Sequence, residues 1–395
     1  MLVQFMVKNV LSFKDETTLD MTAISAYKEH MCNLIDIGTK EKFVRVAAIY
    51  GANASGKSNL NVAMRCFQRI VAESLNNVGE DASSVLQECY VPFSFDSVKE
   101  NSEFQIVEIV YDCEYRYGFE YNDESIVTEW CYRKNLKTNR TAIIFERTAE
   151  SVAFGASVKK ECSAYQEQIP PETLALTFFN KLKMKTNVFE TIYSSIMDTL
   201  VVPSDFCENT AILETFLPQV IDREKDKFIS FLNAIDSGIK DIEYDDSEKE
   251  TKFFTYHLGK DEKIYPLNLY LESEGTLKGI ALFIYARMAL LSNRSIFVDE
   301  LNSKLHPLLL KFIVDLFYAE ESTAQLLYTT HDTTLMDKKF FRRDQIWFVQ
   351  KNAYGCSELF ALSDFRVRPD ASFEKDYLAG VYGGIPLLKD YEIKE

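Results

Sequence analysis

Apolar positions in the first part of the chain follow the period of a β-strand. Val3, Phe5 and Val7 alternate with polar or exposed positions, and an apolar run over residues 43–50 leads into a glycine-rich turn. Within residues 90–147, the segments FQIVEIVYD and YRYGFEYN are rich in β-branched and aromatic side chains. Both features are typical of strands. This region is therefore predicted to be mainly β-structure.

Helical periodicity starts at Ser58, directly after the glycine-rich turn. Apolar side chains then recur at helical spacing, at Leu60, Ala63, Met64, Phe67, Ile70 and Val71. Residues 150–262 are dominated by helix-compatible stretches, such as 187–200 and 212–232, which prolines separate. We interpret this middle region as a helical insertion.

The last third of the chain alternates between the two periods. A helix is predicted over residues 275–291 and another over 307–317, and between and after them come the strands SIFVD, QLLYTT and IWFVQ. Alternating strands and helices indicate a largely parallel sheet. We therefore predict an α/β fold with a mixed, mostly parallel sheet, an antiparallel β subdomain and a helical insertion. The predicted boundaries are 1–149, 150–262 and 263–395.

Composition narrows the class of protein. The 395 residues include 47% apolar and 26% charged residues, which is near the average of folded soluble proteins. The net charge of −16 excludes a passive nucleic-acid coat protein, so any DNA or RNA contact needs a local basic patch. The longest nearly apolar stretch, residues 279–292, is too short for a membrane span. We expect no membrane contact and a cytoplasmic location.

The eight cysteines and four histidines do not form a zinc pattern. No two cysteines form a C-x-x-C pair, and no histidine stands near a cysteine at ligand spacing. We expect reduced, mostly buried thiols.

One segment carries a strong phosphate-binding signal. Residues 51–58 read G-A-N-A-S-G-K-S, which matches the phosphate-loop pattern (Walker A) between a strand and a helix. Glycines let such a loop turn its N–H groups inward, Lys57 adds a positive charge, and the Ser58 hydroxyl suits Mg²⁺. The predicted ATP-binding residues are Gly51, Asn53, Ala54, Ser55, Gly56, Lys57, Ser58 and Asn59. The alternative is a glycine-rich turn without a ligand.

A pair of carboxylates ends the apolar strand SIFV. In parallel sheets, catalytic groups gather at the carboxyl ends of strands. Asp299 is predicted to hold Mg²⁺ together with Ser58, and Glu300 to polarise the attacking water as a general base. A helix-capping pair on a surface turn is the alternative for this pair alone. The phosphate loop favours the catalytic interpretation.

Two further motifs fit the same chemistry. His331 ends the strand QLLYTT and could donate to a γ-phosphate, although a histidine at a strand end is often only a packing or capping residue. Ser273 and Gly275 open the helix that precedes the acid strand, where a hydroxyl and backbone N–H groups could face an anion. Taken alone, Ser273 is also a good helix cap.

The order of these motifs resembles the ATP-binding cassette heads of the Rad50 and structural-maintenance type. More narrowly, the chain resembles the RloA/AbiL group of bacterial anti-phage ATPases, related to the OLD family. The segments that carry the resemblance are N-V-L-S-F-K-D-E (9–16), E-S-E-G-T (272–276), D-E-L-N-S-K-L-H-P (299–307), T-T-H-D-T-T-L-M-D (329–337), R-R-D-Q-I-W-F-V (342–349) and F-E-K-D-Y-L-A-G-V-Y-G-G-I-P (373–386). The family usually has an acidic residue at the position of Asn302. Gln87 and Gln105 are the candidates for a Q-loop, and ordinary surface roles are preferred for both.

The resemblance implies a mechanism. Two subunits would sandwich two ATP molecules, with Lys57, Ser58 and Asp299 from one subunit and Ser273 and Gly275 from the other. ATP and Mg²⁺ are the implied cofactors, and a homodimer or higher oligomer the implied assembly.

Three functions remain open from the sequence. The first is the regulatory ATPase of an anti-phage system that controls a separate, operon-encoded nuclease or toxin. The second is an ATPase head for DNA repair or chromosome binding, for which lysines and arginines at 338–343 and 181–185 are candidate basic clusters. The third is a scaffold that binds ATP without hydrolysis.

Overall fold

The computed structural model of the chain describes residues 1–76, 84–205, 211–235, 238–247, 251–319, 321–368 and 371–385. Its centre is a six-stranded sheet with the order β11-β15-β16-β5-β17-β18. The first five strands run parallel, and β18 is antiparallel to β17. The strands are β5 (Val46–Gly51), β11 (Leu200–Val202), β15 (Ser295–Val298), β16 (Gln325–Thr330), β17 (Ile346–Lys351) and β18 (Ser357–Ala361).

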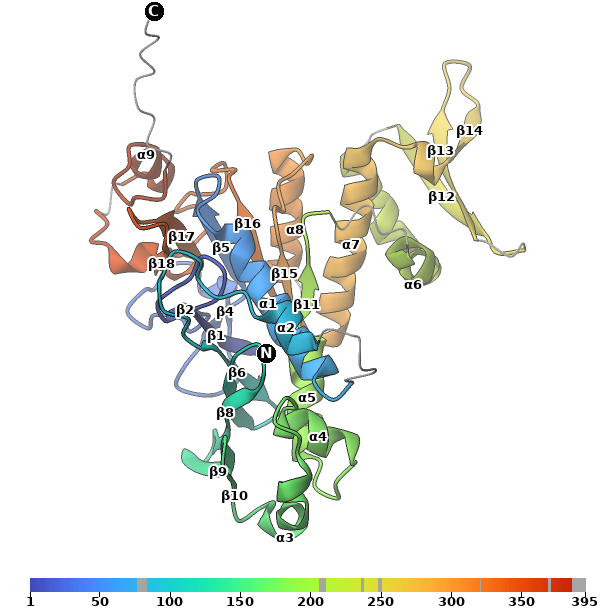
Figure 1. The fold of residues 1–395 in the computed structure, drawn as a ribbon. Coiled ribbons are helices and arrows are strands. Elements are labelled where there is room, and N and C mark those ends of the chain that lie inside the picture. Colours follow the sequence, from blue (N-terminus) through green and yellow to red (C-terminus); the bar gives the residue numbers. More distant parts are fainter. Residues whose placement is uncertain are drawn as a thin grey trace, which may run out of the picture.

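A seven-stranded antiparallel sheet lies against this centre, low in the view of Figure 1. Its strand order is β10-β9-β8-β7-β6-β1-β2. The strands are β1 (Leu2–Lys8), β2 (Thr17–Asp20), β6 (Ser102–Val110), β7 (Cys113–Tyr121), β8 (Ile126–Asn135), β9 (Arg140–Thr148) and β10 (Val152–Phe154). Together the two sheets confirm the predicted α/β class, with a mostly parallel sheet and an antiparallel β subdomain.

Two smaller sheets complete the β-structure. β3 (Leu34–Ile35) pairs with β4 (Phe43–Val44). A three-stranded antiparallel sheet projects from the body at the upper right of Figure 1. Its strands are β12 (Ile239–Asp245), β13 (Lys252–Leu258) and β14 (Ile264–Asn268).

The helices are α1 (Lys57–Glu73), α2 (Val85–Cys89), α3 (Lys159–Cys162), α4 (Ala175–Lys181), α5 (Val188–Asp198), α6 (Ala211–Ile235), α7 (Glu274–Ser292), α8 (Pro307–Ala319) and α9 (Phe373–Leu378). Helix α1 covers one face of the central sheet, and α6, α7 and α8 cover the other; the remaining helices pack elsewhere. The long predicted helices are present within three residues of their expected ends. However, residues 150–262 also contain β10, β11, β12 and β13. This middle region is therefore less uniformly helical than its sequence pattern indicates.

The central sheet separates two hydrophobic cores, and the alternation along β5 shows this. Ala47 and Ile49 face the core that holds α1, α4 and the antiparallel sheet. Val46, Ala48 and Tyr50 face the core formed with α6, α7 and α8. Successive side chains of a strand point to opposite faces, so a strand buried on both faces reads as one continuous apolar run.

Helix α7 is also apolar along its length because most of it is buried. By length and composition it could cross a membrane, and it is the one described helix for which this holds. Two thirds of its apolar window is buried inside the molecule. It packs between α6, α8 and the sheet. Burial on nearly all sides explains an apolar sequence without a polar face.

Candidate functional site

The loop between β5 and α1 has the backbone that its glycines predict. Ala54 and Gly56 adopt left-handed conformations, with φ values of 60° and 111°. Gly56 also has no room for a side chain, because an added Cβ would lie 2.2 Å from the Ser357 hydroxyl. Lys57 is buried, and its ammonium donates to the carbonyls of Gly51 (2.7 Å) and Ala52 (2.9 Å). The lysine therefore lies across its own loop.

A set of hydroxyl groups supports this loop from beneath. Ser357 Oγ donates to the Ser55 carbonyl (2.6 Å) and lies within hydrogen-bond distance of Ser12 Oγ (2.7 Å). Asn59, in the first turn of α1, donates to the same Ser12 Oγ at 2.7 Å. Ser12 belongs to the N-V-L-S-F motif, and Ser357 begins β18. The sequence analysis assigned no role to either serine, although the motif around Ser12 was a usable signal.

The acid pair follows β15, and its neighbour β16 holds it in place. The buried Thr329 hydroxyl donates to Asp299 Oδ1 at 2.5 Å and accepts from the Glu300 backbone N–H at 2.8 Å. Glu300 has a left-handed backbone, with φ 47°, which is uncommon for a residue with a side chain. Thr329 thus holds the Asp299 carboxylate and the Glu300 backbone through one hydroxyl. No sequence signal singled it out.

The loop and the acid pair meet at one edge of the sheet. Burial lowers the pKa of Lys57, while the negative charges of Glu300 and Asp299 oppose that shift. These carboxylates are therefore close enough to act on the lysine charge. The parallel strands β5, β16 and β15 are neighbours, so their carboxyl ends open at the same edge.

His331 lies at this edge as well. It is the first residue after β16, which stands between β5 and β15 in the sheet, and its side chain is exposed. The neighbouring Thr330 hydroxyl donates to Asn302 Oδ1 at 2.8 Å. The histidine is thus flanked by the phosphate loop on one side and the acid pair on the other.

Ser273 and Gly275 are placed differently. Ser273 Oγ accepts from the backbone N–H of Thr276 at 3.1 Å, so it caps α7 as the alternative interpretation expected. An added Cβ on Gly275 would lie 3.0 Å from the Lys304 carbonyl, and Lys304 pairs with Glu274 at 2.6 Å. Within one chain, this helix start therefore lies against the segment after the acid pair.

The residue before this cap ties it to the projecting sheet. Glu272 Oε1 lies 2.7 Å from His257 Nε2 and also accepts from the Thr255 hydroxyl, and both partners are on β13. Side-chain contacts of Glu272 therefore join the start of α7 to the β12–β14 sheet.

The residues at the edge fit a magnesium nucleotide. Among the described residues, Ser55 Oγ is buried without a hydrogen-bond partner. A Cβ on Gly51 or Gly56 would collide with neighbouring protein atoms, so the loop is closely packed at both glycines. Asn53 and Ala54 are exposed, and Ser58 and Asn59 are half-buried. Ser58 and Asp299 offer oxygen donors of the kind that Mg²⁺ prefers.

Several sequence candidates serve structural purposes instead. Gln87 closes a capping box at the start of α2, and Gln105 accepts from the Trp130 indole at 3.1 Å. Arg342 is fully buried and holds Asp344 through two bonds, of 2.9 and 2.8 Å. Arg343 stacks on the Tyr27 ring. Both arginines of the expected basic cluster near His331 therefore make contacts inside the protein.

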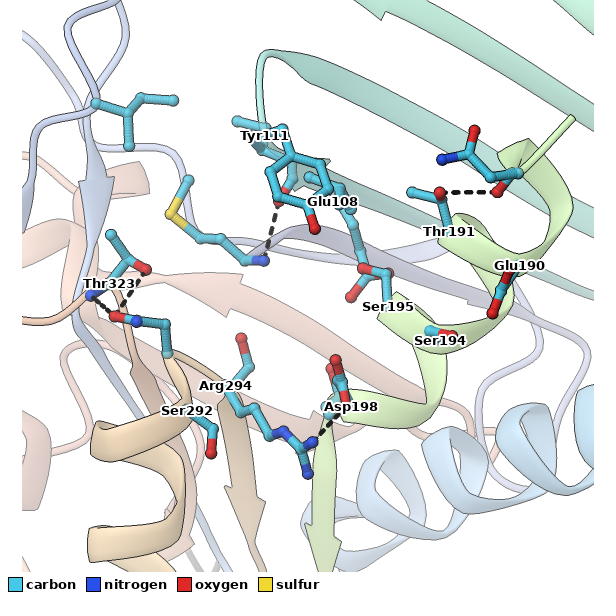
Figure 2. Close-up of a pocket in the computed structure, with 18 residues that line it drawn as sticks. Glu108, Tyr111, Glu190, Thr191, Ser194, Ser195, Asp198, Ser292, Arg294 and Thr323 are labelled. Atoms are coloured by element: carbon cyan, nitrogen blue, oxygen red, sulfur yellow. Dashed lines mark hydrogen bonds and ion pairs between the residues drawn. The ribbon is translucent and has the colours of Figure 1, made fainter.

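A cavity of about 650 Å³ lies elsewhere, between the two large sheets. Figure 2 shows its lining from β6 and the following turn, α5, and the turn between α7 and β15. Arg294 pairs with Asp198 there at 2.9 Å, and Ser195 donates to Glu108 at 2.7 Å. Arg294 immediately precedes β15, so the cavity is at the amino edge of the parallel strands. It contains none of the motif residues.

One family model matches part of the chain. Residues 208–337 match the family described as "AAA domain, putative AbiEii toxin, Type IV TA system". That range contains Ser273, Asp299, Glu300 and His331, while the phosphate loop lies outside it. No curated protein matches the chain.

Two solved structures are similar over nearly the whole chain. The first is an SmcHead bound to the C-winged helix domain of ScpA, with a TM-score of 0.45 and 14% identity, over 95% of this chain and 99% of that one. The second is the SMC head domain from Thermotoga maritima, with a TM-score of 0.42 and 13% identity, over 93% and 99%. The chain is thus similar in part to AAA domains of the AbiEii type.

Proposed function

We propose that the chain is an ATPase that hydrolyses ATP at the edge formed by β5, β16 and β15. The observation that carries the proposal is the meeting of Lys57, Asp299 and Glu300 at that edge. The loop N–H groups and Lys57 would bind the phosphates, and Ser58 and Asp299 would hold Mg²⁺. Bound Mg²⁺ would neutralise charge that develops on the phosphate oxygens. Glu300 would orient and deprotonate the attacking water, and His331 would donate to the γ-phosphate.

We further propose that the complete site needs two chains. Ser273 is exposed at the start of α7 and Gly275 adds no side chain there, so this helix start is accessible to a second copy's nucleotide. A ligand that binds only the closed dimer shifts the population toward that dimer. Hydrolysis would then reopen it.

In the cell, we propose that this switch is the cytoplasmic sensor of an anti-phage system. It would control a separate nuclease or toxin encoded in the same operon. The matched family's description names a toxin–antitoxin system, and this supports the proposal. A DNA-repair head is the second candidate, and the burial of Arg342 argues against its basic patch near His331.

Phosphate release and equilibrium dialysis with Mg²⁺–ATP test the catalytic proposal. We expect wild type to bind and hydrolyse ATP and Lys57→Ala to lose binding. The matched control Lys99→Ala, at an exposed lysine, should behave as wild type. Unchanged ATP affinity in Lys57→Ala would refute the loop assignment. Binding without phosphate release in wild type would leave only the scaffold function.

Mixing variants tests the two-chain site. Lys57→Ala and Ser273→Arg should each be inactive alone. A mixed dimer contains one site with both defects and one with neither, so mixing should partly restore hydrolysis. No recovery, with both variants folded and able to dimerise, would contradict the shared site.

Phage challenge tests the biological role. Bacteria that carry this gene with its neighbouring reading frames should survive phage, and Lys57→Ala should abolish the protection. Hydrolysis stimulated by DNA, with an affinity that falls steeply with salt, would instead favour the repair function.

A further inference from the structure

Two cysteines lie where helix α1 packs against helix α2, in contact with the same hydrophobic core, and their thiols are hydrogen-bond partners. Cys66 lies on the third turn of α1 and is half-buried, and Cys89 is the last residue of α2 and is buried. The Arg69 guanidinium on α1 forms an ion pair with Glu88 on α2 and fixes the two helices side by side. The Tyr121 hydroxyl donates to the Cys89 carbonyl at 2.9 Å and holds that end of α2.

The surroundings make Cys66 the reactive partner. A hydrogen bond from the Cys89 thiol lowers the pKa of Cys66 to about 7, against the opposing effect of burial, and the charges of Arg65 and Arg69 assist. Thiolates rather than thiols are nucleophiles, so a half-exposed cysteine with cationic neighbours is a typical site of oxidation. The same hydrogen bond is the first cause that raises the pKa of Cys89.

We propose that Cys66 and Cys89 form a redox-modification site that responds to peroxide. Cys66 is the attacking thiolate and Cys89 the resolving thiol. A disulfide in a cytosolic protein is usually transient and serves sensing or catalysis.

The chemistry balances with hydrogen peroxide as the oxidant. The Cys66 thiolate attacks one peroxide oxygen, forms a sulfenic acid and releases hydroxide, which becomes water on protonation. The thiolate that raised the pKa of Cys89 is then gone, so Cys89 can lose its proton. Its sulfur attacks the Cys66 sulfur and expels a second hydroxide, which takes up that proton. Two thiols and one peroxide thus give one disulfide and two waters.

The disulfide would act on the phosphate loop through a short chain of contacts. Two residues after Cys89, the Val91 carbonyl accepts from the Leu11 N–H at 2.7 Å. The next residue, Ser12, accepts from Asn59 beside the loop. A disulfide requires an S–S distance of about 2.05 Å, so it would draw α2 toward α1 and displace the segment that bears Ser12.

The first test measures the modification alone, in the full-length chain. After treatment with hydrogen peroxide, peptide mapping should find Cys66 linked to Cys89. In Cys89→Ser, dimedone should instead label a persistent sulfenic acid at Cys66. Cys113→Ser, at a half-buried cysteine on β7, is the matched control and should leave the linkage intact. Iodoacetamide should modify Cys66 with a rate that is half-maximal near pH 7. Neither linkage nor dimedone label at Cys66 would overturn the proposal.

The second test measures the consequence and rests on the proposed ATP binding. Oxidation should weaken the affinity for a fluorescent ATP analogue by about fivefold or more, the low end of common coupling between two sites. Dithiothreitol should restore it, and Cys66→Ser should not respond to peroxide. An unchanged affinity in fully linked protein would overturn the regulatory part. If reduced protein binds no ATP, the proposed function fails while the modification site is still judged by mass spectrometry.

Discussion

Two clusters of buried charge in this molecule are built in opposite ways. In the antiparallel sheet, Glu129 on β8 is 1% exposed. Its carboxylate accepts hydrogen bonds from the Tyr117 hydroxyl (3.0 Å) and from the N–H groups of Ala175 (2.7 Å) and Leu176 (3.0 Å). It also forms an ion pair with the Arg147 guanidinium at 3.6 Å. The Arg147 guanidinium also donates hydrogen bonds to backbone carbonyls of residues 170–173. Every oxygen of this carboxylate is used inside the fold.

At the edge of the central sheet, the charged residues are fixed in position but keep hydrogen-bonding groups unpaired. The backbone of Glu300 is fixed at both ends, because Thr329 accepts from its N–H and Lys278 donates to its carbonyl at 3.2 Å. Among the described residues, no hydrogen bond to its carboxylate is found. Within the part of the chain that the structure describes, Lys57 bonds only to carbonyls of its own loop, and Ser55 Oγ has no hydrogen-bond partner.

The difference distinguishes a structural cluster from the proposed catalytic site. Buried polar groups are normally satisfied, and each exception calls for an explanation. Glu129 joins the start of α4 to β8, so its role is to stabilise the fold. Lys57 and Glu300 keep bonding capacity for something outside the chain. Four substitutions test this contrast, from the largest expected effect to the smallest.

Glu300→Gln should slow ATP hydrolysis by about 10²–10⁴-fold, because the loss of a general base removes that much. ATP binding should be retained, and ATP should trap a dimer detectable by light scattering. Phosphate release in single turnover measures the change. Glu321→Gln, at an exposed residue after α8, is the control. Wild-type turnover in Glu300→Gln would end the assignment of this residue.

Glu129→Gln should destabilise the fold by roughly 2–4 kcal/mol, since an amide N–H₂ would face donors and leave Arg147 unpaired. Chemical denaturation measures this change. Glu146→Gln, exposed on β9, should cost far less. Equal losses in both variants would show that the Glu129 cluster is not a structural anchor.

Ser357→Ala should weaken ATP binding by about 1 kcal/mol, or roughly fivefold, because it removes the hydroxyl that joins Ser12 to the phosphate loop. Equilibrium dialysis provides the comparison. Ser363→Ala, in the short helix after β18, serves as the control. If the two variants bind ATP equally well, the loop does not need its support from β18.

Lys57→Met should leave the free energy of unfolding within about 1 kcal/mol of wild type, or raise it, although ATP binding is lost. Burial lowers the pKa of Lys57, which means that the folded chain disfavours its charged form. Removing the charge therefore relieves a cost. A loss as large as that in Glu129→Gln would erase the contrast between the two clusters.

The sequence predicted much of this arrangement because local signals were strong. The phosphate loop, the acid strand and α7 depend on short stretches whose patterns are nearly unambiguous. Other predictions failed where distant partners decided the outcome. Arg342 looked like a surface cation, but it is buried because Asp344 and carbonyls of residues 24–29 satisfy its guanidinium.

By itself, then, the sequence predicted the long helices and the mostly parallel sheet, and it singled out Lys57, Asp299 and Glu300 as candidate site residues. Periodicity and strand-end chemistry are local, so they can be read along the chain. Only the tertiary structure decided that Thr329 holds the acid pair, that Ser12 and Ser357 support the loop, and that Cys66 meets Cys89. These contacts join residues far apart in sequence, and their register depends on how the sheet and helices pack.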